Sequence, residues 1–236
     1  MKKTIQTAPL GLLLGLGLVM QASAAITYVD VDPTNGGNTT LTTGGAITLG
    51  GNSGTDNNWR NRTDAGLLSN VLEASTGSAS NTENVPILRT TISGLTDGQT
   101  YQIYGYWHSS SAWDVRLGLA EGSLTPYGGT SGNPGTAIAN PNTYFANGGA
   151  LGLPTSYATL RESYLGTATA TGGGIIYAFV DDIPNGETGA GTNGSSGQGR
   201  TFFDGFGYQL VPEPSTVSMG AVALLALATR RRRNAS

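Results

Sequence analysis

The feature that most constrains this chain is a repeated alternation of apolar and polar residues, interrupted by glycine, asparagine, aspartate or proline. Such alternation places apolar side chains on one face of an extended strand, and the interrupting residues favour turns. Between residues 25 and 210 no segment has a helical apolar period with capping residues. Nine segments are predicted strands: residues 26–31, 46–49, 57–62, 87–92, 100–108, 113–120, 163–171, 174–182 and 201–210.

These strands predict an all-β fold, a single β-sandwich of jelly-roll type over residues 25–210. Nine short strands in one stretch of this length favour one sandwich over the alternative of two small immunoglobulin-like domains. Two glycine-rich stretches, residues 123–142 and 185–199, are predicted loops, and Asp97-Gly98 predicts a tight turn before the longest strand. The chain has no cysteine, so disulfides and thiolate metal sites are excluded.

Charge also restricts the partners of the predicted sandwich. Residues 25–210 contain 14 acidic residues and six arginines, a net charge of −8, and the only lysines are Lys2 and Lys3. This charge repels phosphate backbones, so no nucleic-acid partner is predicted. Residues 189–194 match the pattern G-x-G-x-x-G, but no predicted helix follows them, so we interpret the match as a consequence of composition.

The first 24 residues have the three parts of a secretory signal peptide. Two lysines precede an apolar stretch over residues 10–20, and Ala22-Ser23-Ala24 is a small-residue cleavage site. The sequence therefore predicts export and cleavage by signal peptidase after Ala24. The alternative is a retained N-terminal anchor, for which the apolar run is short.

The last 26 residues combine a Pro-Glu-Pro triplet, an apolar stretch and an arginine cluster. The apolar stretch covers residues 217–229, and as a helix these 13 residues would span about 20 Å of a hydrocarbon core about 30 Å thick. Counting from Val211 gives 19 residues, which is enough to cross. Because flanking arginines stay in the cytoplasm, residues 211–236 predict a short transmembrane helix that stops export and anchors the chain transiently.

This tail resembles the PEP-CTERM sorting signal of Gram-negative bacteria. The resemblance implies recognition by an exosortase, a membrane-embedded protease, followed by removal of the tail and by release or attachment at the cell surface. It also implies an association with exopolysaccharide and biofilm matrix. The alternative is an ordinary tail anchor, and residues 234–236 after the arginines are a departure from the pattern. The residues that carry the resemblance are Val211, Pro212, Glu213, Pro214, Ser215, Thr216, Arg230, Arg231, Arg232 and Arg233.

A hairpin between residues 100–108 and 113–120 is predicted to present a polar face. Pairing Trp107 with Trp113 buries the apolar face of both strands. The opposite face then carries tyrosine rings, which stack on sugar rings, beside charged groups that bind hydroxyls. The alternative is a solvated face on which Tyr–Arg stacking only stabilises the hairpin. The candidate polysaccharide-binding residues are Tyr104, Tyr106, Asp114 and Arg116.

A second resemblance concerns residues 92–107 and 201–210. They are similar to the central and final strands of galactose-binding-like jelly rolls, the fold of many carbohydrate-binding modules, and this similarity implies a structural calcium ion near the first and last strands. The residues themselves also suggest a metal site, because alternation places Asp204 in an otherwise apolar row with Phe202 and Phe206, where an unpaired carboxylate is unfavourable. The alternative is that Asp204 caps backbone amides or pairs with an arginine. The candidate calcium ligands are Asp30, Asp32 and Asp204.

Catalytic patterns are weak. His108 is the only histidine, and although serines and Asp114 lie nearby in sequence, neighbours along one hairpin rarely converge into a triad, so we predict an exposed loop histidine. Asp181 and Asp182 are adjacent and therefore point to opposite faces of a strand, which does not suit a glycosidase. The sequence favours a non-catalytic protein of the cell surface or extracellular matrix that binds exopolysaccharide. The alternatives are a structural matrix component without a ligand site and a polysaccharide hydrolase.

Overall fold

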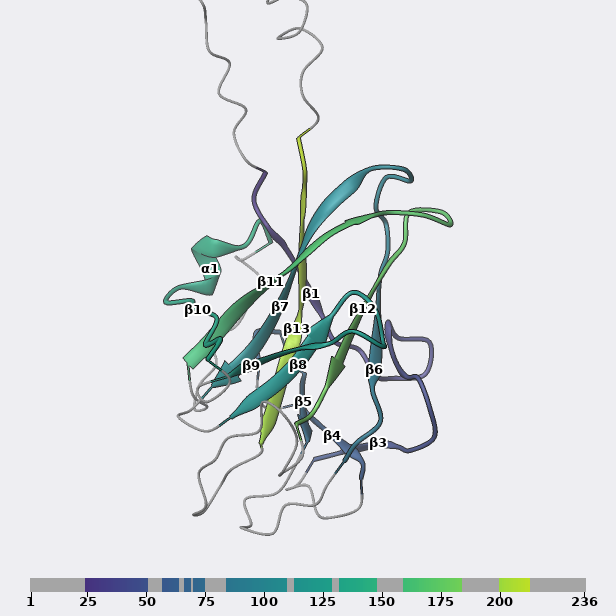
Figure 1. The fold of residues 1–236 in the computed structure, drawn as a ribbon, viewed down its shortest axis with the longest axis vertical. Helices are drawn as coiled ribbons and strands as arrows, with labels where there is room; N and C mark the ends of the chain where they lie inside the picture. Colours follow the sequence, from purple (N-terminus) through teal and green to yellow (C-terminus); the bar gives the residue numbers. More distant parts are fainter. Residues whose placement is uncertain are drawn as a thin grey trace, which may run out of the picture.

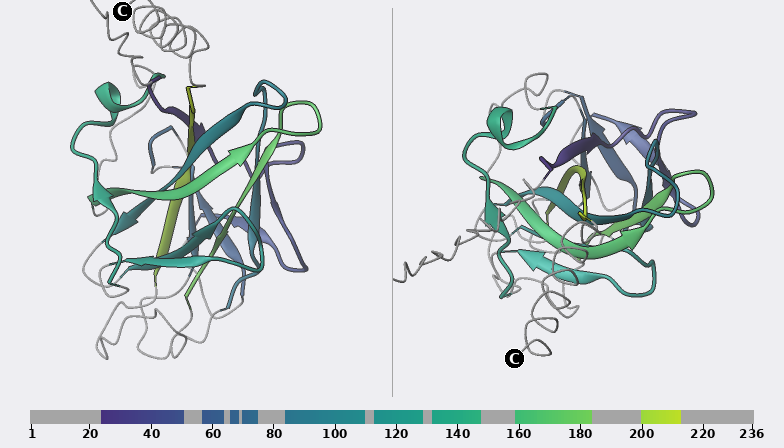
Figure 2. Two further views of the ribbon diagram at one scale, coloured as in Figure 1. Left: turned by 45° about the horizontal axis from the view of Figure 1, so that its top comes forward. Right: turned by 90° about the horizontal axis from the view of Figure 1, so that it is seen from above.

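The protein folds into two β-sheets that lie face to face (Figures 1 and 2). The computed structural model describes residues 24–50, 57–63, 66–68, 70–74, 84–109, 113–128, 132–147, 159–183 and 200–212. Within these ranges the single helix is one turn, α1 (Pro141–Tyr144). None of the helical structure described there is long and apolar enough to cross a membrane, and the helix predicted at residues 217–229 lies outside these ranges.

The larger sheet is built around three long strands. Its order is β10 (Thr136–Ala137), β11 (Thr159–Thr169), β7 (Thr100–Ser109), β13 (Thr201–Leu210), β5 (Val71–Ala74), β4 (Trp59–Arg62) and β3 (Ile47–Leu49), and β1 (Thr27–Asp30) also pairs with β13. The smaller sheet has the order β2 (Thr39–Leu41), β6 (Leu88–Ile92), β12 (Ile176–Asp181), β8 (Asp114–Gly118) and β9 (Thr125–Gly128).

The main core lies between the two sheets. Ile103, Trp107 and Phe206 from the larger sheet pack in one cluster with Leu117 and Val180 from the smaller sheet, and each of these side chains is at most 1% exposed. A second, smaller cluster covers part of the outer face of the larger sheet. It contains Ile26, Tyr28, Leu67, Tyr106, Ile138, Phe145 and Leu160. The larger sheet therefore has one fully buried face and one face that is covered only in part.

The all-β prediction is confirmed, and each of the nine predicted strands overlaps a strand of the structure, although β11 begins four residues earlier than predicted. Four short strands were not predicted: β2, β5, β9 and β10. The prediction of a loop over residues 123–142 was wrong, because β9, β10 and the start of α1 lie there. The turn at Asp97-Gly98 is confirmed, with Gly98 at a φ of +80°. The predicted loop at 185–199 lies outside the described residues.

The predicted hairpin does not form. β7 pairs with β11 and β13, whereas β8 pairs with β12 and β9, so the two strands belong to different sheets. The buried face of β7 was predicted correctly, since Tyr101, Ile103 and Trp107 all lie in the main core. These side chains meet Val115 and Leu117 across the sandwich rather than beside them in one sheet. Alternation identifies the apolar face of a strand, but it does not identify the sheet that the strand joins.

The predicted apolar row on β13 is also interrupted. Phe203 pairs with Trp107 but Gly205 pairs with Tyr106, so Asp204 is the extra residue of a β-bulge. The bulge shifts the alternation, and Phe203 and Phe206 both lie in the main core. On its other side β13 pairs with β5 before the bulge and with β1 after it. Asp204 therefore lies where β13 changes its partner strand.

Candidate functional site

The structure does not bring together the four residues of the predicted polysaccharide platform. Tyr104 lies on the outer face of the larger sheet, because its neighbours Ile103 and Gly105 face the core. Arg116 lies on the outer face of the smaller sheet and forms an ion pair with Asp181 at 3.6 Å. Tyr106 and Asp114 are buried. The predicted arrangement fails because it required β7 and β8 to be neighbours in one sheet.

A different group of polar aromatic residues gathers on the outer face of the larger sheet. The pairing of β7 with β11 places Glu162 opposite Tyr106 and Tyr164 opposite Tyr104. Residues paired in this way have side chains on the same face of the sheet. Helix α1 lies beside this face and contributes Tyr144 (Figure 1). We call Tyr104, Tyr144, Glu162 and Tyr164 the tyrosine platform.

Glu162 is the centre of this platform. The hydroxyl groups of Tyr106 and Tyr144 each donate a hydrogen bond to Glu162 Oε2, both at 2.8 Å. The rings of Tyr104 and Tyr164 are 5.5 Å apart and tilted by 51°. Tyr164 is 51% exposed and Tyr144 is 38% exposed, whereas Tyr106 is buried beneath them. The platform thus presents two exposed aromatic rings together with a carboxylate that phenol groups hold in place.

The tyrosine hydroxyl groups remain hydrogen-bond donors at neutral pH. Burial, and next the charge of Glu162, raise the pKa of Tyr104. Burial and the bonded carboxylate of Glu162 also raise the pKa of Tyr106 and of Tyr144 above the ordinary value for tyrosine. Tyr104 Oη donates to Gln102 Oε1 at 2.8 Å, and Gln209 Oε1 lies 3.3 Å away. These bonds fix the rings before any ligand arrives, which lowers the entropy lost on binding.

An open hollow of about 380 Å³ adjoins the platform. This volume is in the range of about 300–1,000 Å³ that is typical of small-molecule sites. Tyr127 of β9 lies at its far side, and its hydroxyl donates to the backbone carbonyl of Tyr164 at 3.2 Å. The hollow therefore lies where the edges of the two sheets meet. Its polar lining includes Tyr127, Asn133, Thr136, Glu162 and Ser163.

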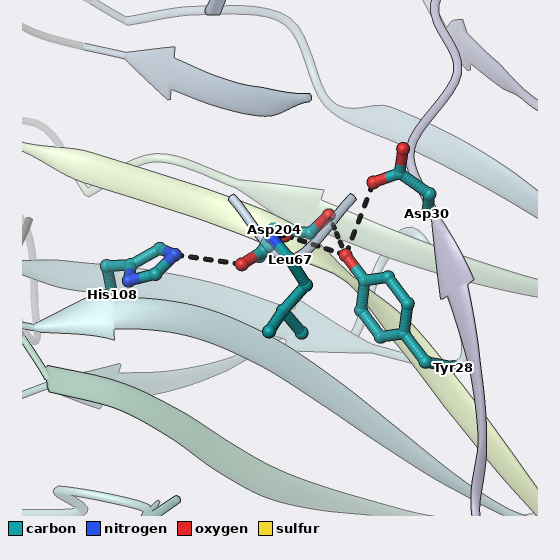
Figure 3. A network of polar contacts seen from close by, with 5 residues as sticks. All are labelled: Tyr28, Asp30, Leu67, His108 and Asp204. Atoms are coloured by element: carbon teal, nitrogen blue, oxygen red, sulfur yellow. Dashed lines mark hydrogen bonds and ion pairs between the residues drawn. The ribbon is translucent and has the colours of Figure 1, made fainter. Parts of the chain in front are cut away.

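Two of the three candidate calcium ligands, Asp30 and Asp204, lie in a network of polar contacts (Figure 3). Asp204 is fully buried, and its Oδ1 accepts hydrogen bonds from Tyr28 Oη at 2.6 Å and from the backbone N–H of Leu67 at 3.1 Å. His108 Nε2 lies 2.8 Å from Asp204 Oδ2 and donates to it, because a carboxylate only accepts. The backbone N–H of Leu67 thus has Asp204 as its hydrogen-bond partner at the bulge, where β13 changes its partner strand.

Asp30 lies beside this network and makes hydrogen bonds of its own, which leave those of Asp204 in place. Tyr28 Oη is 3.3 Å from Asp30 Oδ1, and the side-chain amide of Asn70 donates to Asp30 Oδ2 at 3.2 Å. Burial, and secondarily the charge of Asp204, raise the pKa of Asp30 to about 7. Burial and the same two carboxylates raise the pKa of Tyr28. The tyrosine hydroxyl therefore holds its proton between two acidic groups.

These residues do not fit a calcium site. Both oxygens of Asp204 already accept from protein donors, and donors around a carboxylate exclude a cation from the same positions. Asp32 is separate, since its Oδ1 accepts from the backbone N–H of Thr34 at 3.0 Å, a local turn interaction. Across the described part of the chain no group of three or more acidic or histidine side chains could hold a metal ion. We assign no calcium ion to Asp30, Asp32 or Asp204.

The prediction of an exposed loop histidine was wrong. His108 is 1% exposed and lies within β7, with its side chain on the outer face of the larger sheet beneath the loop that contains Leu67. Ser109, the next residue on the strand, points to the opposite face, so these two residues and Asp204 do not form a Ser-His-Asp triad. Ser110 and Ser111 lie outside the described residues.

The processing signals fall mostly outside the described residues, which include Ala24, Val211 and Pro212 but not Ala22, residues 213–216 or Arg230–Arg233. β1 and β13 are antiparallel, and Thr27 pairs with Tyr208. The backbone N–H of Val211 donates to the carbonyl of Thr100 at 3.0 Å, and the Gln209 side chain donates to the carbonyl of Ala24. Ala24 and Val211 therefore lie at the same end of the sandwich.

No protein-family model matches this chain, and no curated protein sequence matches it. The residues of the site therefore carry the functional argument. Sequence reasoning missed Glu162, Tyr144 and Tyr164 as site residues. The only sequence signal for them was the alternation that puts Tyr164 on one face of a strand. Their grouping depends on the pairing of β11 with β7, which is about 60 residues away in sequence.

Proposed function

We propose that this protein is exported, is sorted by its PEP-CTERM tail to the cell surface or extracellular matrix, and binds polysaccharide without catalysing a reaction. In this proposal residues 25–210 form a jelly-roll sandwich and the tyrosine platform with its hollow is the binding site. The observation that carries the proposal is the pair of exposed rings, Tyr144 and Tyr164, beside the half-buried Glu162.

The chemistry of the platform matches that of a sugar. A pyranose has an apolar face of C–H groups, which packs on aromatic rings, and a rim of hydroxyl groups, which bond to carboxylates and amides. Tyr144 and Tyr164 supply rings, and Glu162 and Asn133 supply polar atoms within the same hollow or at its edge. The rings of Tyr144 and Tyr164 are positioned by α1 and β11, which follow one another along the chain.

The geometry of the ends is compatible with attachment through the tail. Val211 follows the last strand directly, so a tail that begins there leaves the sandwich beside its N-terminal residue Ala24. Cleavage by signal peptidase and by exosortase would then act at one end of the domain. The tyrosine platform lies close to that end, because Gln209 contacts both the Tyr104 hydroxyl group and the carbonyl of Ala24, and Phe145, which follows Tyr144, is bridged to Ile26.

Binding is tested by applying the full chain, kept in mild detergent, to an array of bacterial and plant polysaccharides. We expect selective binding to a subset of the array. A chain that binds no member would contradict the polysaccharide-binding proposal and favour the structural matrix component. Reducing sugars released from any member over time would contradict the non-catalytic part of the proposal and favour the hydrolase.

Sorting is tested separately in a bacterium that has an exosortase. Replacing Glu213 and both prolines of the triplet with alanine is expected to leave the chain uncleaved in the inner membrane, whereas the parent chain reaches the cell surface or the medium. Equal processing of the two chains would show that the tail acts as an ordinary anchor.

A further inference from the structure

The charge and hydrogen bonds of Glu162 narrow the class of polysaccharide. Resting on the function proposed above, we propose that the tyrosine platform selects polysaccharides with free amino groups, that is, polymers of 2-amino-2-deoxyhexose, over their N-acetylated and uronic-acid counterparts.

The first argument is the free oxygen of the central carboxylate. Both phenol donors, Tyr106 and Tyr144, bond to Glu162 Oε2. Within the described residues Glu162 Oε1 accepts no hydrogen bond, and the side chain is only half-buried. The same residue lines the hollow of about 380 Å³. An ammonium group that packs on the tyrosine platform can therefore donate to Oε1 without displacing the bonds that hold the carboxylate.

The second argument is the composition of the surface around Glu162. The residues that line the hollow contain no lysine, arginine or histidine, and Glu162 is their one charged side chain. The platform tyrosines add aromatic faces, which attract cations as well as C–H groups. Arg161, the preceding residue on β11, lies on the other face of the strand, and its Nη1 donates to the carbonyls of Pro134 and Gly135. The guanidinium of Arg161 is thus held by the carbonyls of two residues that line the hollow, whereas the one side-chain charge of the lining itself, that of Glu162, is negative.

The third argument is the electrostatic field that the net charge of the domain produces at long range. Residues 25–210 carry a net charge of −8, which attracts a cationic polymer and repels an anionic one. The smaller sheet has an exposed tyrosine too, but Arg89 lies over the ring of Tyr177 at 4.9 Å and gives that face a positive charge. Tyr177 therefore lies under a guanidinium group, whereas the tyrosine platform is centred on a carboxylate.

The test measures affinity for three soluble oligosaccharides of equal length: glucosamine, N-acetylglucosamine and galacturonic acid hexamers. Isothermal titration with the full chain in mild detergent is performed at a pH at which the amines are protonated. We expect the glucosamine hexamer to bind at least about tenfold more tightly than the acetylated hexamer, because hydrogen bonds to charged groups are the stronger class. The galacturonic acid hexamer is expected to bind most weakly.

Two charge-removing variants separate the site from the general field. Glu162→Gln keeps an oxygen that accepts from the phenols, and it is expected to bring the glucosamine and acetylated hexamers to within about twofold of each other. Glu121→Gln removes the same charge from an exposed turn after β8 and is expected to leave the preference unchanged. Equal thermal melting temperatures of both variants and the parent would establish that they fold.

The outcomes distinguish this inference from the function on which it rests. Binding of the acetylated hexamer as tight as that of the glucosamine hexamer, or an equal loss in Glu121→Gln, would overturn the amino-sugar preference while leaving polysaccharide binding intact. Tighter binding of the galacturonic acid hexamer would overturn it too. Failure of all three hexamers and of the polysaccharide array would overturn both proposals.

Discussion

The buried acidic pair beside Tyr28 predicts that the stability of this protein decreases as the pH rises from 4 to 7. The pKa of Asp30 in the folded protein is raised from 3.8 to about 7 by burial first and by the charge of Asp204 second, against the opposing hydrogen bonds of Asn70 and Tyr28. Between these two pH values the folded chain holds a proton on Asp30 that the unfolded chain has lost. The contribution of protonated Asp30 is therefore fully present below about pH 4 and is lost as the pH passes 7.

The magnitude follows from the width of that interval. Each pH unit in which only the folded state binds the proton costs about 1.4 kcal/mol of unfolding free energy. From pH 5 to pH 7 the cost is about 2 kcal/mol, because the folded carboxyl is itself half ionised at pH 7, and this is a large part of the total of about 5–15 kcal/mol for a typical domain. In Asp30→Asn the residue cannot ionise, so the variant should lack this decrease.

The assay is urea denaturation followed by tryptophan fluorescence at several pH values between 5 and 7.5. We expect Asp30→Asn to be no more stable than the parent at pH 5 and more stable at pH 7.5. Asp32→Asn is the matched control, because hydrogen bonds from Thr34 lower the pKa of Asp32, and this carboxyl is ionised in both states over the whole interval. Parallel curves for Asp30→Asn and the parent would refute the reasoning.

Two further predictions concern a buried ion pair and a tight turn. Glu73 is fully buried and accepts from Arg62 Nη1 at 3.0 Å and Arg200 Nε at 3.1 Å, so Glu73→Gln should reduce the unfolding free energy by about 3 kcal/mol; a loss below about 1 kcal/mol in urea denaturation would contradict this. Gly174 has a φ of +82°, and a Cβ added there would lie 1.9 Å from the carbonyl oxygen of Leu95. Gly98 has a similar φ of +80°, but a Cβ added there would meet nothing within 4 Å. Gly98→Ala should therefore cost about 1–2 kcal/mol for the left-handed backbone alone, and Gly174→Ala should cost clearly more; equal losses would show that the turn at Gly174 moves aside.

The strands were predictable from sequence because the signal for a strand is local. Alternation in residues 100–108 identifies Ile103 and Trp107 as buried, and the structure agrees. The partner of each strand was not predictable, because an apolar face can be buried against the opposite sheet as well as beside a neighbour. The short connection after Ser109 suggested a hairpin, yet the chain crosses there from one sheet to the other.

The polar sites were less predictable because they are assembled from distant segments. Asp204 was identified as an unusual carboxylate, but its partners Tyr28 and His108 lie 176 and 96 residues away, and the bulge that turns it outward leaves no local pattern. The tyrosine platform similarly depends on the pairing of β7 with β11. Tyr104 was predicted to lie beside Asp114 and Arg116, but these two residues belong to the other sheet.

The central claim is that the tyrosine platform binds polysaccharide, and one comparison tests it most directly. Tyr164 and Tyr177 are similarly exposed, 51% and 45%, but they lie on opposite outer faces of the sandwich. The measurement is the affinity of the full chain for the tightest-binding polysaccharide of the array, repeated with Tyr164→Ala and with Tyr177→Ala. The account predicts at least about a tenfold loss for Tyr164→Ala, since an aromatic contact of this kind is worth about 0.5–1.5 kcal/mol beyond the area it buries, and a change within about twofold for Tyr177→Ala. Unchanged binding in Tyr164→Ala, or a larger loss in Tyr177→Ala, would contradict it.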